Sequence, residues 1–184
     1  MDYTEKTLTY EEKFRGKILA VHRDTVTLPD GSEAVREVVE HSGGVGVLPV
    51  DADGNAWCVR QFRYPFGTHL LEVPAGKLEP GESPIDCAVR ELGEETGFTA
   101  AAYTYLGMIY PSPGYCHEVL HIYLATGLTR GQAHLDRGEF LDVETYPLET
   151  LYRMVLRGEL PDAKTAMAVM KAKLILDERK QSNG

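Results

Sequence analysis

The chain has 184 residues, of which 43% are apolar and 26% are charged, the balance of a folded globular protein rather than a disordered one. Its 28 acidic and 19 basic side chains give a net charge of −9, which argues against nucleic acid or an anionic membrane as a partner because both attract basic surfaces. No apolar run approaches the ~20 residues that span a bilayer. The acidic surplus still allows a phosphate ligand, because a divalent cation can lie between carboxylates and phosphate.

The three cysteines, Cys58, Cys87 and Cys116, are scattered along the sequence without a CxxC pair. An odd and scattered set favours free thiols in a reducing compartment over a disulfide framework or a zinc site. The first 17 residues are charged and lack the apolar core of a signal peptide. We therefore expect a cytoplasmic protein.

The first half of the sequence predicts mainly β-strands. Two β-like runs within residues 17–41 flank a Pro-Asp-Gly turn signal at 29–31. A second hairpin is predicted from residues 44–50 and 56–64, and a further strand from 69–74, where a proline ends the ladder.

A helix is predicted between Ser83 and Gly97. Ser83 is a suitable N-cap, Pro84 stands at the first helical position, and Gly97 stands where a left-handed C-terminal cap belongs. Apolar residues at helical spacing predict the buried stripe, namely Ile85, Ala88, Val89 and Leu92.

The second half predicts strands at 104–110 and 118–126, followed by two amphipathic helices at 147–157 and 162–178. Strands, one central helix, more strands and terminal helices predict an α+β fold, an α/β/α sandwich with a mixed β-sheet between helices. We expect an N-terminal antiparallel β region at 1–42 and a main domain at 43–184.

Three glutamates of the predicted helix, Glu91, Glu94 and Glu95, recur at helical spacing on the face away from the apolar stripe. Like charges at this spacing destabilise a helix by roughly 0.2–0.5 kcal/mol per pair, and the macrodipole disfavours anions in the last turn. Gathered carboxylates suit a hard cation such as Mg²⁺ or Mn²⁺. The alternative is a solvated acidic helix face, the commonest role of a charge cluster.

Residues 76–98, GKLEPGESPIDCAVRELGEETGF, resemble the signature of the Nudix hydrolases. That pattern is Gly, five residues, Glu, seven residues, Arg-Glu-apolar, one residue, Glu-Glu, one residue and Gly-apolar. The resemblance implies the Nudix fold and hydrolysis of a substituted nucleoside diphosphate by water attack on phosphorus. It implies two to three Mg²⁺ or Mn²⁺ ions, held by Glu91, Glu94, Glu95 and the Ala75 carbonyl. Glu82 and Arg90 would hold the helix and the loop before it. The solvated-face alternative then has little support.

Three flanking segments are similar to the ADP-ribose pyrophosphatase branch of this family: RQFRYPFGTHLLEVPAGKLEPGE, SPGYCHE and DAKTAMAV. Pro113, fifteen residues beyond Phe98, matches a position associated with ADP-sugar preference. The branch implies cleavage of ADP-ribose to AMP and ribose 5-phosphate by a homodimer. Tyr115 lies where a diadenosine-preferring branch has tyrosine, so another nucleoside diphosphate derivative (a UDP- or GDP-sugar, NADH or diadenosine polyphosphate) stays open.

The same resemblance implies the substrate contacts. Arg36 and Glu37 would reach the nucleotide across the subunit interface, and Arg63 would bind a phosphate. Glu118 would contact the terminal ribose or the metal-bound loop. The alternatives are an exposed Arg36–Glu37 ion pair on a hairpin and, for Arg63, an ordinary surface arginine.

The general base of this branch comes from a mobile acidic loop, which residues 133–144 match. Glu139 aligns best, with Asp136 and Asp142 as alternatives, and Gly138 adds mobility. Glu139, Glu94 and Arg90 form the expected catalytic set. A nucleotide-sensing Nudix domain without catalysis is a less favoured alternative, because every acidic position of the signature is kept.

Overall fold

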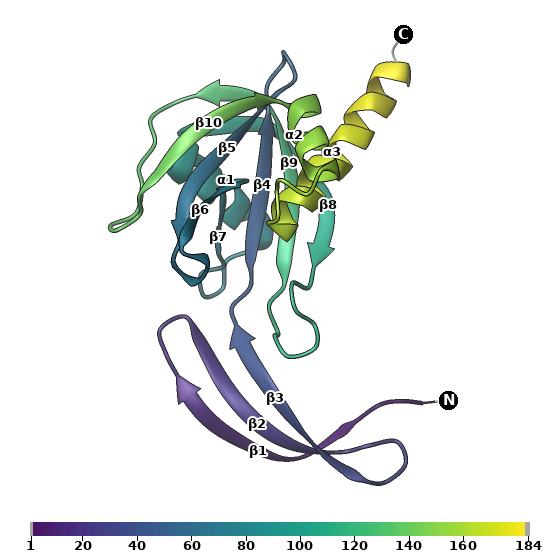
Figure 1. Ribbon diagram of the computed structural model, residues 1–184. Helices are drawn as coiled ribbons and strands as arrows, with labels where there is room; N and C mark the ends of the chain where they lie inside the picture. The colour runs from purple at the N-terminus through teal and green to yellow at the C-terminus, as the bar shows by residue number, and fades with distance from the viewer. Residues whose placement is uncertain (1, 183–184) are drawn as a thin grey trace. The chain divides into compact units, whose positions relative to one another are not determined.

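The structure, a computed structural model, describes residues 2–182 (Figure 1). The chain forms two compact units. One contains the segment up to Gly43 together with Tyr110–Val119, and the other contains Gly44–Ile109 together with the segment from Leu120 onward. Each unit has its own β-sheet.

The first unit is built on an antiparallel three-stranded sheet in the order β1-β2-β3, with β1 at Lys6–Arg15, β2 at Leu19–Thr27 and β3 at Glu33–His41. The turn between β2 and β3 closes with the Gly31 N–H donating to the Leu28 carbonyl, and it confirms the hairpin predicted there. Strand β1 was not predicted, because its many charged residues obscured the alternation of its apolar ones.

The segment Tyr110–Val119 is fastened to β3 by backbone hydrogen bonds. The Val39 N–H donates to the Tyr115 carbonyl (2.7 Å), and the His117 N–H donates to the Val39 carbonyl (2.9 Å). The predicted domain boundary after residue 42 places this segment in the main domain. In the structure the segment packs with the first unit.

The second unit contains a seven-stranded sheet in the order β10-β5-β4-β9-β8, with β6 paired to β5 and β7 paired to β4. Its strands are β4 at Gly44–Val50, β5 at Asn55–Arg63, β6 at Thr68–Glu72, β7 at Ala75–Lys77, β8 at Phe98–Ile109, β9 at Leu120–Arg130 and β10 at Leu141–Pro147. A 3-10 turn, η1 at Tyr64–Phe66, joins β5 to β6. Strands β4 and β9 pair in parallel and the other neighbouring strands described in this sheet pair antiparallel, so the sheet is mixed, as expected.

Within the described residues, three helices cover this sheet: α1 at Pro84–Thr96, α2 at Leu148–Leu156 and α3 at Ala163–Ser182. Figure 1 shows α1 on one face and α2 with α3 on the other. Val47 packs toward α1 while the next residue, Leu48, packs toward α2 and α3, so β4 is buried on both faces. The predicted α/β/α sandwich is therefore confirmed. None of the helices within residues 2–182 is both long and apolar enough to span a bilayer.

The predicted buried stripe of α1 is partly wrong. Ile85 and Val89 are 39% and 45% exposed, and the buried residues of the helix are Cys87, Ala88, Glu91, Leu92, Glu95 and Thr96. Two stripes of helical spacing share Ala88 and Leu92, and spacing alone cannot choose between them. Packing against β4 and β7 selects the stripe that contains two glutamates, so Glu91 and Glu95 lie on the buried face and not on the opposite one.

Candidate metal and phosphate site

Both ends of α1 are fixed by caps that the sequence predicts. Ser83 Oγ accepts a hydrogen bond from the Asp86 N–H (3.2 Å), and Pro84 begins the helix. Gly97 has a left-handed φ of 74°, and its N–H donates to the Gly93 carbonyl (2.9 Å). These caps fix where the helix begins and ends, and the three glutamates lie in its last turns.

Two carboxylates of α1 are buried together. Glu91 is 7% exposed and Glu95 is 3% exposed, and Glu95 Oε2 accepts a hydrogen bond from the Ala75 N–H (3.0 Å). Burial, aided by the nearby negative charges, raises the pKa of Glu95 to about 8 and also raises the pKa of Glu91. A solvated acidic helix face therefore does not describe these two residues. Their mutual repulsion is of the kind that a cation relieves.

Gly76 makes room for one of these carboxylates. A Cβ on Gly76 would lie 1.7 Å from Glu91 Oε1, so no other residue fits there without moving Glu91. The preceding residue, Ala75, contributes the N–H that binds Glu95. The backbone of β7 and the two buried carboxylates thus meet at one place.

Arg90 joins the loop before α1 to the glutamates. Its Nε and Nη2 donate to the two Glu82 oxygens (2.8 and 2.9 Å), and Nη1 donates to Glu91 (2.7 Å) and Glu94 (3.0 Å). Nη2 also donates to the Lys77 carbonyl (3.2 Å). The fork lowers the pKa of Glu82 to about 2 and orients the carboxylates around it.

The donor set fits a hard divalent cation, since it consists of carboxylate oxygens crowded in a buried place that glycine keeps open. Within residues 2–182, however, no three acidic, histidine or cysteine side chains form a group that could hold an ion as they stand. Arg90 binds oxygens of Glu91 and Glu94 in this arrangement, so holding an ion requires these side chains to turn toward it.

The predicted acidic loop lies at the C-terminal end of α1. The His134 N–H donates to the Glu94 carbonyl (2.9 Å), and the Gly131 N–H donates to the Gly97 carbonyl (2.7 Å). Glu139 is close enough for its charge to contribute to the raised pKa values of Glu91 and Glu95. The negative charge of Glu139 therefore adds to the repulsion at the two buried carboxylates.

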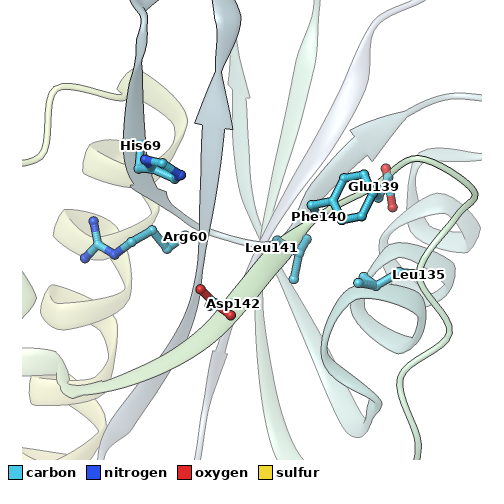
Figure 2. A pocket seen from close by; sticks show the side chains of 7 residues that line it. All are labelled: Arg60, His69, Leu135, Glu139, Phe140, Leu141 and Asp142. Carbon is cyan, nitrogen blue, oxygen red and sulfur yellow. The ribbon is translucent and has the colours of Figure 1, made fainter.

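A cavity of about 310 Å³ opens beside this loop (Figure 2). Its lining residues are Arg60, His69, Leu135, Glu139, Phe140, Leu141 and Asp142. Figure 2 shows Arg60 and His69 on the strand side and Glu139 with Phe140 on the loop side. Both candidate acids Glu139 and Asp142 thus border a space that a ligand could enter.

Arg63 is held by a partner that sequence reasoning missed. Its Nε and Nη2 donate to the two oxygens of Glu72 (2.6 and 2.7 Å). These bonds raise the pKa of Arg63, and the charge of Glu95 adds to the effect. Arg63 is therefore not an unpaired surface arginine.

The remaining candidates lie in the first unit. Arg36 binds Glu5 through Nε (2.9 Å) and Nη2 (2.5 Å), while the next residue, Glu37, is exposed and faces the other side of the strand. Arg36 and Glu37 thus do not pair with each other, and the alternative of an exposed Arg36–Glu37 ion pair is wrong. Glu118 pairs with His41 Nδ1 at 3.3 Å.

A buried polar cluster in the first unit was also missed. The His22 ring lies between Asp24 (2.8 Å) and Glu40 (3.2 Å). The available signal was the spacing of His22 and Asp24 on the same side of a strand as Ala20 and Val26.

Comparison with known proteins agrees with this geometry. The profile of the NUDIX domain matches residues 40–169, and that of the nucleoside diphosphate sugar hydrolase N-terminal domain matches residues 5–39. A solved "ADP compounds hydrolase" superposes with a TM-score of 0.84 at 23% identity, covering 96% of each chain, and shows the same fold.

Among the relatives, the ADP-ribose pyrophosphatase of Bacillus subtilis (strain 168) is 42% identical over 92% of this chain and 93% of its own. The methanol dehydrogenase activator of Bacillus methanolicus is 36% identical over 94% of each chain. The ADP-ribose pyrophosphatase of Mycobacterium tuberculosis is 38% identical over 90% of this chain and 81% of its own. The profile match and the extent of these similarities show that the chain belongs to the Nudix hydrolase family.

Proposed function

We propose that the protein is an ADP-ribose pyrophosphatase that hydrolyses ADP-ribose and related ADP-sugars to AMP and ribose 5-phosphate. The observation that carries the proposal is the burial of Glu91 and Glu95 beside the Cβ-less Gly76. The names of two of the relatives and the flanking segments of the sequence support this substrate class.

Nudix hydrolases generally need divalent metal ions. We propose Mg²⁺ or Mn²⁺, two to three ions, held by Glu91, Glu94, Glu95 and the Ala75 carbonyl. A bound divalent cation supplies Lewis-acid polarisation of the phosphate and lowers the pKa of water. Arg90 contributes to catalysis as a positioning residue that fixes the carboxylates of Glu91 and Glu94, and such supporting contacts typically change activity by about 10- to 100-fold.

The other proposed roles come from the resemblance to the ADP-ribose pyrophosphatase branch, and the positions of the side chains support them. A carboxylate oxygen of Glu139 accepts the proton of the attacking water as the general base, with Asp136 and Asp142 as the neighbouring alternatives. Arg63 binds a phosphate oxygen with the part of its guanidinium that Glu72 does not use.

We further propose a homodimer in the cytoplasm, in which residues 1–42 contribute to dimerisation and to substrate binding. Arg36 and Glu37 would contact the nucleotide across the subunit interface, and Glu118 would contact the terminal ribose or the metal-bound loop. Apolar side chains exposed on β1 support an interface there, and they are Leu8, Tyr10 and Phe14. The three cysteines are free, which fits a reducing compartment.

Incubation with ADP-ribose and Mg²⁺, followed by separation of nucleotides, tests the substrate. AMP and ribose 5-phosphate should appear in equal amounts, and catalytic efficiency should exceed that for a UDP-sugar, a GDP-sugar, NADH and diadenosine polyphosphates. A higher catalytic efficiency for one of these compounds would identify that compound as the substrate instead. Nucleotide binding with no turnover in Mg²⁺ or Mn²⁺ would favour the sensing alternative.

A further inference from the structure

We propose that Lys164, a buried lysine on α3, is a positioning residue for Arg63 and acts through the carboxylate of Glu72. The inference rests on the proposed function, because it concerns the phosphate contact assigned to Arg63. It also accounts for the segment DAKTAMAV, to which the chemistry described so far gives no role.

Glu72 stands between two cations. Its side chain is almost fully buried. Arg63 donates hydrogen bonds to both of its oxygens, and Lys164 Nζ donates to Oε2. Burial by itself would raise the pKa of Glu72, but the hydrogen bonds of Arg63 and the charge of Lys164 outweigh it, and the pKa is lowered. Glu72 is therefore an ionised carboxylate that both cations orient.

The start of α3 fixes the lysine. Asp162 caps the helix by accepting from the Thr165 N–H (3.0 Å) and from Thr165 Oγ1 (2.5 Å), and its other oxygen pairs with Lys164 Nζ (3.1 Å). Thr165 Oγ1 in turn accepts from the Val73 N–H (2.9 Å), next to Glu72 in the chain. These bonds tie α3 to the end of β6 from two sides.

The four charged groups balance, with two cations and two carboxylates. Loss of Lys164 would leave Glu72 held on one side only and would leave the group with a net charge of −1. Because Glu72 uses Nε and Nη2 of Arg63, the direction of Nη1 follows from the orientation of the Glu72 carboxylate. By orienting Glu72, Lys164 thus determines the direction in which the guanidinium of Arg63 can bind a phosphate.

The test compares Lys164→Met with Lys173→Met in the full-length protein. Lys173 is a matched control because it lies on the same helix and also pairs with two carboxylates, Asp177 and Glu149. Both changes are made in the wild type and in Arg63→Ala. Binding of ADP with Mg²⁺ is measured by calorimetry, steady-state hydrolysis of ADP-ribose is followed, and melting temperatures are recorded.

Lys164→Met should raise the Kd for ADP and the KM for ADP-ribose about tenfold, with kcat changed less than threefold. In the Arg63→Ala background it should change the Kd less than twofold, and Lys173→Met should stay within twofold of its parent throughout. If Lys164→Met is not folded at the assay temperature, Glu72→Gln replaces it, and the same dependence on Arg63 is expected.

An unchanged Kd in folded Lys164→Met, or an equal loss with and without Arg63, would overturn the inference. ADP binding in Arg63→Ala at wild-type affinity would overturn it as well, while leaving the hydrolase proposal intact. A wild type that binds ADP but does not cleave ADP-ribose would refute the proposed function alone, because the ADP titrations still decide the role of Lys164.

Discussion

Replacement of Gly76 by alanine should separate activity from stability. The new Cβ would lie 1.7 Å from Glu91 Oε1, whereas ordinary contact begins at 3.4 Å, so the carboxylate must move by roughly 1.7 Å. Misplacement of a catalytic group by about 1 Å can cost on the order of 100-fold in rate. We therefore expect Gly76→Ala to lower kcat for ADP-ribose at least ~100-fold.

The cost in stability should be small. The clashing atom is the end of a flexible side chain, and Gly76 does not have a positive φ. Overpacking costs about 1–3 kcal/mol, of which the lower unfolded-chain entropy of alanine offsets about 0.4–1 kcal/mol. For a chain of this size about 1 kcal/mol corresponds to 2–4 °C, so the melting temperature should fall by only a few degrees.

Gly93→Ala is the matched control. It lies in the same signature segment, on α1, and the nearest atom to a new Cβ outside the backbone of the helix is the Phe98 carbonyl oxygen at 4.0 Å. It should keep the wild-type rate and gain up to ~1 kcal/mol of helix stability. A folded Gly76→Ala variant with wild-type kcat would show that hydrolysis does not depend on the position of the Glu91 carboxylate.

Three other predictions follow from the same structure. Glu139→Gln should lower kcat ~100-fold or more with an unchanged melting temperature, and a smaller effect in steady-state assays would assign the base elsewhere. Gly97→Ala combines a φ of 74° with a Cβ 2.7 Å from the Ala133 nitrogen, so urea unfolding should show a loss of about 2 kcal/mol, and no loss would contradict the close approach. The hydrogen bond to Asp24 raises the pKa of His22 above 6.5, so its stabilisation is complete below pH 6.5 and is lost as pH rises through the folded-state value. The difference in unfolding free energy between wild type and His22→Gln should shrink over that range, and a pH-independent difference would contradict it.

Local signals in the sequence predicted the local structure well. The helix at Pro84–Thr96 is flanked directly by its cap residues, Ser83 and Gly97, and the β2–β3 hairpin has its turn residues between the strands. The side of α1 that is buried depends instead on β4 and β7, which pack against it. Residue spacing carries no information on that choice, and this is why Ile85 and Val89 were placed inside.

The candidate site likewise combines residues that are close in the sequence with residues that only the fold brings together. The signature segment identified Glu91, Glu94 and Glu95 because they lie within a few residues of each other. The Lys164–Glu72 bond joins residues 92 positions apart, and only the folding of α3 onto the sheet brings them together. Strand β10 was missed for a related reason, since it is defined by its pairing with β5 and has a mixed, partly exposed sequence.

The proposed hydrolase depends on binding of the divalent cation by the buried glutamates of α1. Titration of the protein with Mn²⁺, with the free ion followed by electron paramagnetic resonance, tests this claim most directly when wild type and Glu95→Gln are compared. We expect saturable Mn²⁺ binding by the wild type and an affinity at least ~10-fold weaker in Glu95→Gln, because the variant loses a ligand charge. Equal Mn²⁺ affinity in the two proteins would contradict it.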